Sequence, residues 1–149
     1  MLEGKYLAMR IHAKRANWLK VVEMSEEVLS RFPSDPDARS YRLMAAFETG
    51  ALAGVPATIR SAENFLNLSQ LYYTIGAFDR CITAAYEALK LRPNYPEAYN
   101  NISGALIRLE KWEQSTEAAR EALRIQPDFK SAQENLVQSQ RRKKDLANP

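Results

Sequence analysis

Hydrophobic residues recur along this chain at the three- and four-residue spacing of amphipathic α-helices, as between Val21 and Leu29, and no segment alternates like a β-strand. Between Ser34 and Asp37 the pattern stops and restarts, because Asp35 can cap a helix that has Pro36 at its first position. The pattern predicts helices over residues 5–15, 18–31, 36–49, 62–75, 78–91, 96–109, 111–125 and 131–142.

One pattern of 34 residues is written twice between Ala62 and Phe129. Each copy has an aromatic residue near its start, an aliphatic residue three positions later, small residues in its second helix and a closing proline. A fixed period of this length in a helix-forming sequence predicts a helix-turn-helix solenoid. The paired positions are Phe65, Leu68, Gly76, Phe78, Ala85, Ala88, Leu89 and Pro93 with Tyr99, Ile102, Glu110, Trp112, Ala119, Ala122, Leu123 and Pro127.

This pattern resembles the tetratricopeptide repeat (TPR). The resemblance implies an all-α fold, a right-handed superhelix of about seven or eight helices, in which the first helix of each repeat lines a concave groove. It is specific to architecture and much less specific to function, because one fold can carry many functions.

The repeat register predicts one domain over residues 1–149, with two weaker stretches at its start. Gly50 and Gly76 are 26 residues apart, so part of the solenoid is missing between them. Either residues 51–59 form a shortened turn, or residues from 57 onward extend the next helix backward; a molecule in two separately packed parts, 1–50 and 62–149, is the alternative. The predicted segments are a degenerate repeat 2–35, an irregular repeat 36–61, repeats 62–95 and 96–129, a capping helix 130–144 and a tail 145–149.

The residues of the capping helix are expected to divide between its two sides. Ala132, Leu136 and Val137 are expected to face the core, and polar and basic residues to face water. The basic run Arg141 to Lys144 and the tail after it are expected to fray into solvent.

Composition and motifs exclude most kinds of chemistry. A formal net charge of +3 without a focused basic patch does not favour nucleic acid, and no apolar stretch is long enough for a membrane span. The sequence has no phosphate-binding glycine loop, metal-ligand spacing or nucleophile elbow. His12 has no evident catalytic partner, and Cys81 holds a position where alanine would serve. We therefore expect no enzyme activity, catalytic residue, metal or cofactor.

The compartment stays open from sequence. Met1 to Lys5 lack the layout of a secretory signal, and the single cysteine cannot form an internal disulfide. Both features slightly favour the cytoplasm.

Three asparagines follow the repeat period: Asn67, Asn101 and Asn135 are each 34 residues apart. A similar asparagine ladder in O-linked N-acetylglucosamine transferase and kinesin light chain holds the backbone of an extended peptide, so the resemblance implies peptide binding here. A carboxamide offers both donors and an acceptor to a peptide backbone. Asparagine is, however, common at this position in repeats without a known ligand. The other expected groove residues are Gln70, Tyr73, Thr74, Asn100, Ile107 and Arg108, with Gly104 opening space beside them.

A different groove chemistry is absent. Family members that bind chaperone tails resemble one another in a clamp of lysines, an asparagine and an arginine. The matching positions here carry Leu66, Gln70 and Asn135, which argues against a chaperone tail as ligand.

Three functional hypotheses remain. The first is a protein-protein interaction scaffold that binds an extended peptide or a partner helix of unknown identity. The second is an appendage of a larger protein, because the closing repeats resemble those at the C-termini of bacterial membrane glycosyltransferases. The third is self-association through the first helix; its basic residues Arg10, Lys14 and Arg15 disfavour stacking on an identical helix, so a monomer is expected.

Overall fold

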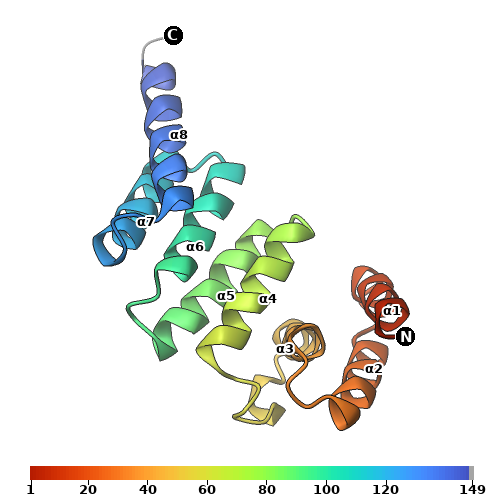
Figure 1. Ribbon diagram of the computed structural model, residues 1–149. Coiled ribbons are helices and arrows are strands. Elements are labelled where there is room, and N and C mark those ends of the chain that lie inside the picture. The colour runs from red at the N-terminus through yellow and green to blue at the C-terminus, as the bar shows by residue number, and fades with distance from the viewer. Residues whose placement is uncertain (148–149) are drawn as a thin grey trace. The chain divides into compact units, whose positions relative to one another are not determined.

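The computed structural model describes residues 1–147, and within them the chain is entirely helical apart from its connections (Figure 1). The described part contains eight α-helices, one short 3-10 helix and no strand, which confirms the predicted all-α helical-repeat class. The helices are α1 (Leu2–Lys14), α2 (Trp18–Arg31), α3 (Pro36–Thr49), η1 (Leu52–Gly54), α4 (Ala62–Thr74), α5 (Phe78–Leu91), α6 (Pro96–Arg108), α7 (Trp112–Ile125) and α8 (Lys130–Ala147).

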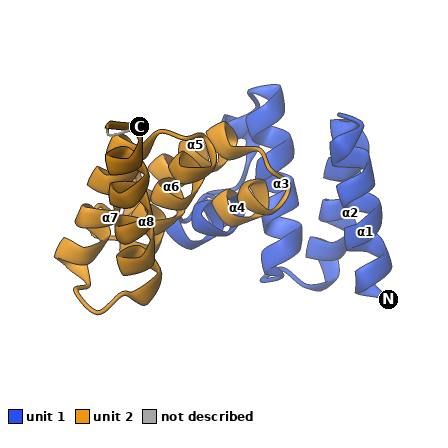
Figure 2. Cartoon of the chain, turned by 90° about the horizontal axis from the view of Figure 1, so that it is seen from above, with its two compact units in different colours: residues 1–68 blue, residues 69–149 orange. Residues whose placement is uncertain are grey.

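Two compact units divide the chain, one of residues 1–68 and one of residues 69–149 (Figure 2). We call them unit 1 and unit 2. The boundary falls inside α4, so that this helix contributes its first half to unit 1 and its second half to unit 2.

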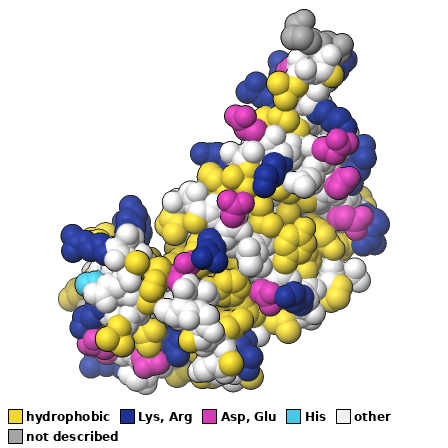
Figure 3. All heavy atoms as spheres, turned by 180° about the vertical axis from the view of Figure 1, so that it is seen from behind, with side chains coloured by type: hydrophobic (Ala, Val, Ile, Leu, Met, Phe, Trp, Pro, Cys, Tyr) yellow, Lys and Arg dark blue, Asp and Glu magenta, His cyan; other side chains and the backbone are white. Residues whose placement is uncertain are grey.

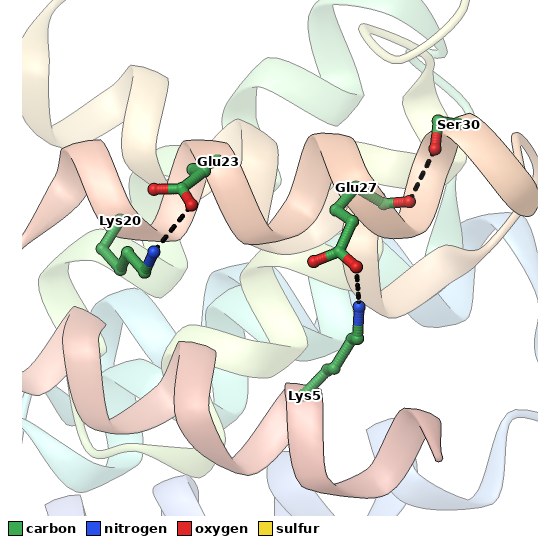
Figure 4. A network of polar contacts seen from close by, with 5 residues as sticks. All are labelled: Lys5, Lys20, Glu23, Glu27 and Ser30. Atoms are coloured by element: carbon green, nitrogen blue, oxygen red, sulfur yellow. Dashed lines mark hydrogen bonds and ion pairs between the residues drawn. The ribbon is translucent and has the colours of Figure 1, made fainter.

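In unit 1, α1 and α3 both pack on α2, and they also contact each other, around a small aliphatic core. Met9, Val21 and Leu43 are completely buried. At the surface Lys5 of α1 forms an ion pair with Glu27 of α2 (Figure 4). Because both charges are partly exposed, such a pair contributes little to stability, and the buried aliphatic residues carry the packing.

The start of α3 has the predicted cap. Asp35 accepts a hydrogen bond from the backbone N–H of Ala38 at 2.8 Å, and Pro36 occupies the first helical position. The hydroxyl of Tyr6 in α1 donates to the same carboxylate at 2.6 Å. Burial and this hydrogen bond raise the pKa of Tyr6. Asp35 therefore caps the N-terminus of α3 and also holds α1 through the hydrogen bond from Tyr6.

Residues 51–61 form η1 and turns where a second helix of the repeat would otherwise stand. Val55 and Ile59 are buried, and the Nδ2 of Asn64 donates to the carbonyl of Ile59 at 3.0 Å. α4 begins at Ala62, so residues from 57 onward do not extend it backward. The shortened turn is the alternative that the structure contains.

Each of the helices α1, α3, α4 and α6 is followed within two residues by a residue of positive φ. Two of these residues are Gly50 and Gly76, for which this conformation carries no side-chain penalty. The other two are Ala16, with φ 54°, and Glu110, with φ 59°. The turn therefore forms with or without glycine.

In unit 2, small side chains stand wherever consecutive helices approach closely. Ser103 of α6 and Ser115 of α7 exchange hydrogen bonds, each hydroxyl donating to the other residue's carbonyl at 3.0 Å. Ser69 and Cys81 occupy the matching positions 34 residues earlier, and their Oγ and Sγ atoms are 3.8 Å apart. Alanines are completely buried in α5 and α7, as close helix packing requires: Ala84, Ala85, Ala88, Ala119 and Ala122.

α8 closes unit 2 differently from the expectation. Ala132 is completely buried and Leu136 is half-buried, but the side chain of Val137 is 64% exposed, so its expected place in the core is wrong. A complete repeat would bring a further helix over this side of α8, and the described chain has none. The helix also continues to Ala147, so the expected tail is helical over residues 145–147; residues 148–149 lie outside the described part.

Candidate peptide-binding surface

The three asparagines of the 34-residue period lie on α4, α6 and α8 and are all half-buried. Asn67 belongs to unit 1, whereas Asn101 and Asn135 belong to unit 2. The geometry of the candidate surface is therefore described for α6, α8 and the second half of α4. Asn67 has no hydrogen-bond partner among the described residues.

Asn101 is held in place by a hydrogen bond to a buried serine. Its Nδ2 donates to the Oγ of Ser69 at 2.8 Å, and Ser69 is completely buried. The carboxamide oxygen of Asn101 accepts no hydrogen bond from any described residue. The amide group of Asn101 is therefore held in place, while its oxygen remains able to accept a hydrogen bond.

Asn135 is anchored to a different kind of partner. Its Nδ2 donates to the side-chain oxygen of Asn100 at 3.0 Å and to the backbone carbonyl of Asn100 at 3.4 Å. The residue of α6 that matches Ser69 is Ser103, and its hydroxyl is already engaged by Ser115. The asparagines share a period in sequence, but they do not share a partner.

Gly104 lies between two of the expected groove residues. A Cβ atom placed on it would come 3.5 Å from the Tyr73 ring and 3.8 Å from the Nδ2 of Asn135. These are ordinary contact distances, so a small side chain could be accommodated. Glycine leaves the backbone of α6 uncovered between Tyr73 and Asn135.

Arg108 ends α6 with its charge held over an aromatic ring. Its guanidinium lies 4.9 Å from the centroid of the Phe78 ring, and the Tyr73 ring meets Phe78 edge-on at 5.5 Å. Arg108 is exposed and forms no ion pair with a described residue. A guanidinium stacked in this way keeps its N–H groups available for a carboxylate.

The remaining expected groove residues are less suited to contact a ligand. Gln70 and Thr74 are exposed on α4, and the Thr74 hydroxyl donates to the carbonyl of Gln70 at 2.9 Å. Ile107 is buried, with 8% of its side chain exposed, so it supports the surface from beneath. Sequence reasoning did not identify Ser69 as the anchor of Asn101; its signal was the recurrence of small residues at 69 and 103.

The described residues contain no group of three or more His, Cys, Asp and Glu side chains placed to hold a metal ion. His12 is half-buried in α1, and its Nδ1 has no hydrogen-bond partner within residues 1–147. None of the described helices is both long and apolar enough to cross a membrane.

Cys81 is expected to be unreactive in the folded protein. The thiol is completely buried, and burial raises its pKa to about 11, with the Ser69 hydrogen bond acting in the opposite direction. A rise of two units from the ordinary value of 9.0 lowers the thiolate fraction near neutral pH by about 100-fold. Alkylation by iodoacetamide at pH 8 should therefore be at least about 100-fold slower in native protein than in urea-unfolded protein. Equal rates would show that the thiol is accessible.

The same shift predicts an alkaline loss of stability. The folded state holds the thiol proton more tightly than the unfolded state does, so the free energy of unfolding falls as pH rises from about 9 towards 11. Urea unfolding across this range should show a shallower fall in Cys81→Ala than in wild type. Parallel curves for the two proteins would contradict the assignment.

Residues 62–95 and residues 96–129 each match the family model described as Tetratricopeptide repeat. Each of these two segments is therefore similar to a tetratricopeptide repeat, and together they make up 68 of the 149 residues. The first consists of α4 and α5 and the second of α6 and α7, and these are the two copies of the 34-residue pattern.

Three solved structures, two of them TPR domains, are similar in fold to most of the chain. The TPR domain of Arabidopsis OM64 is similar with a TM-score of 0.57 and 14% identity, over 85% of this chain and 96% of its own. The first TPR domain of human RPAP3 reaches 0.60 with 16% identity, over 88% and 95%. The MamA protein reaches 0.60 with 17% identity, over 96% and 84%. No curated protein matches the chain. Identities this low establish the fold alone.

Proposed function

We propose that this TPR chain is a protein-interaction scaffold, and that the surface of α6, α8 and the second half of α4 binds an extended peptide of a partner protein. TPR domains bind protein partners, and the family is generally non-catalytic. The observation that carries the finer proposal is the state of Asn101, whose amide is anchored on Ser69 while its oxygen remains open.

An anchored carboxamide suits a peptide backbone. The hydrogen bond to Ser69 removes rotational freedom from Asn101 before a ligand arrives, so less entropy is lost on binding. The open oxygen can then accept a backbone N–H of the ligand. One such bond contributes about 0.5–1.5 kcal/mol, which corresponds to roughly a 2- to 12-fold change in affinity.

Arg108 adds a preference for acidic ligands. Its unpaired guanidinium lies on the same helix as Asn101 and Gly104, seven residues beyond Asn101, and Tyr73 completes the aromatic support beneath it. A peptide with an aspartate, a glutamate or a terminal carboxylate at this end could form a forked ion pair. Asn67 belongs to unit 1, and its role in binding stays a prediction from its sequence position.

The test separates the ligand contact of Asn101 from its structural contact. Peptides are selected from an unbiased display library with wild-type protein, and their dissociation constants are then measured with Asn101→Ala and with Ser69→Ala. Both variants lose the internal hydrogen bond, but only Asn101→Ala loses the carboxamide. We expect Asn101→Ala to weaken binding by roughly 2- to 12-fold, and Ser69→Ala, which loses only the anchoring of the amide, to weaken it by a smaller factor.

Two results would overturn this proposal. Equal losses in the two variants would assign Asn101 a purely structural role, and a wild type that selects no peptide would remove the surface from consideration. Circular dichroism melts of both variants establish that each is folded under the conditions of the binding measurement.

The second hypothesis, an appendage of a larger protein such as a bacterial membrane glycosyltransferase, rests on the resemblance of the closing repeats. No observation from the structure favours it over the first.

A further inference from the structure

A second groove lies elsewhere on unit 2, between α5 and α7 and above α6. Its volume is about 560 Å³. Ile102 and Leu106 of α6 lie at its floor, where they are 1% and 7% exposed, and Tyr86 of α5, which is 51% exposed, stands at its wall. The remaining lining residues are Asp79, Ile82, Thr83, Tyr99, Lys111, Gln114, Glu117, Ala118 and Glu121.

The rim of this groove is acidic. Asp79 of α5 and Glu117 and Glu121 of α7 oppose a single cation, Lys111. Neither Asp79 nor Glu117 forms an ion pair with a described residue, whereas Glu121 accepts from Arg124 at 2.9 Å. An apolar floor between unpaired carboxylates fits a ligand that combines aliphatic side chains with positive charges. Figure 3 shows one face of the molecule, on which a broad hydrophobic area is bordered by charged side chains.

The outer face of α1 has the complementary composition. Leu7 and Ile11, one helical turn apart, are 50% and 41% exposed, although both are aliphatic. Arg10 and Lys14, also one turn apart, both lie on one side of this aliphatic pair and form no ion pair with described residues. The opposite face of α1 is the buried one and carries Met9. This helix therefore presents two aliphatic anchors with two cations along one side of them.

We infer that α1 of one copy of this chain docks into the groove between α5 and α7 of a second copy. A helix can lie between two helices when residues four apart insert into the groove, as Leu7 and Ile11 are spaced to do. Arg10 and Lys14 then meet Glu117 and Glu121. The contact joins two different surfaces, so each copy offers one of each to its neighbours.

The basic C-terminal half of α8 fits this groove less well. Its exposed aliphatic residues, Val137 and Leu146, are nine residues apart, which is about two and a half turns and places them on opposite sides of the helix. Within the basic run, Lys143 already pairs with Glu113. α8 thus lacks a single face with aliphatic anchors and free cations.

The test is sedimentation velocity of the untagged chain over a range of concentrations. Wild type should associate with rising concentration, and association should weaken as salt is raised. Reversing charge on α1, with Arg10→Glu and Lys14→Glu, should raise the dissociation constant at least about tenfold, because like charges then face each other. Reversing the charge of the groove, with Glu117→Lys and Glu121→Lys, should raise the dissociation constant to the same extent.

Mixing the two charge-reversed proteins provides the decisive measurement. The acidic α1 of one variant then faces the basic groove of the other, and the remaining pair of surfaces is the native one, so the equimolar mixture should associate again. Matched controls are Arg141→Glu with Arg142→Glu, and Asp128→Lys with Glu134→Lys. They alter net charge equally but leave both surfaces intact, so they should associate like wild type.

Each contrary result counts against the inference. A wild type that stays monomeric at every concentration overturns it, as does a mixture that does not associate. If the Arg141 and Arg142 reversal dissociates the wild-type assembly while the α1 reversal does not, α8 is the occupant and the assignment to α1 is wrong. Circular dichroism of each variant excludes unfolding as the cause.

Discussion

Replacing Leu43 by alanine is expected to lower the free energy of unfolding by about 2–5 kcal/mol. Leu43 lies at the centre of α3 and is completely buried in unit 1. The change removes transfer free energy and leaves a cavity that the surrounding helices fill only in part. Urea unfolding followed by circular dichroism measures the loss, which is a large fraction of the about 5–15 kcal/mol typical of a whole domain.

Leu19→Ala is the matched control for this measurement. Leu19 lies on α2 in the same unit, but its side chain is 82% exposed. An exposed substitution of this kind normally changes stability by less than about 0.5 kcal/mol. If the two leucines had equal effects, Leu43 would not belong to a packed core.

Replacing Ala85 by leucine is expected to destabilise unit 2 by about 1–3 kcal/mol. Ala85 is completely buried on α5, at a position where the matching residue of the next repeat is Ala119. Three added carbon atoms at a close helix contact force either strained side-chain rotamers or a shift of the backbone. The shift of the urea midpoint, with the slope unchanged, gives the magnitude.

Thr83→Leu adds an aliphatic side chain to the same helix at an exposed position and serves as the control. Its expected effect is within about 0.5 kcal/mol. Unchanged stability in Ala85→Leu would mean that α5 has enough space at this point to accept leucine, and the repeat register for this helix would then be wrong.

Much of the fold could be predicted from sequence because its signals are local. The 34-residue period, the buried alanines of α5 and α7 and the cap at Asp35 each depend on residues close together in the chain. The exposed position of Val137 could not be predicted from its aliphatic character. It depends on a neighbouring helix that the described chain lacks.

The candidate site shows the same division. The period selected Asn101 and Asn135, and both lie half-buried on the expected helices. Their hydrogen-bond partners depend on which serine is available as an acceptor. Ser69 faces a cysteine, which is a weak hydrogen-bonding group, and accepts a hydrogen bond from Asn101. Ser103 is already hydrogen-bonded to Ser115. Equivalent positions in two repeats therefore acquired different contacts.

By itself, the sequence determined the helical class, the helix positions to within a few residues and the small side chains at the helix contacts, because these follow from periodicity and propensity. Only the tertiary structure decided where the backbone takes a conformation that the residue type disfavours. Ala16 and Glu110 take the left-handed conformation that Gly50 and Gly76 take readily. Burial of the helices on either side of each turn outweighs the cost of about 1–2 kcal/mol for a residue with a Cβ atom.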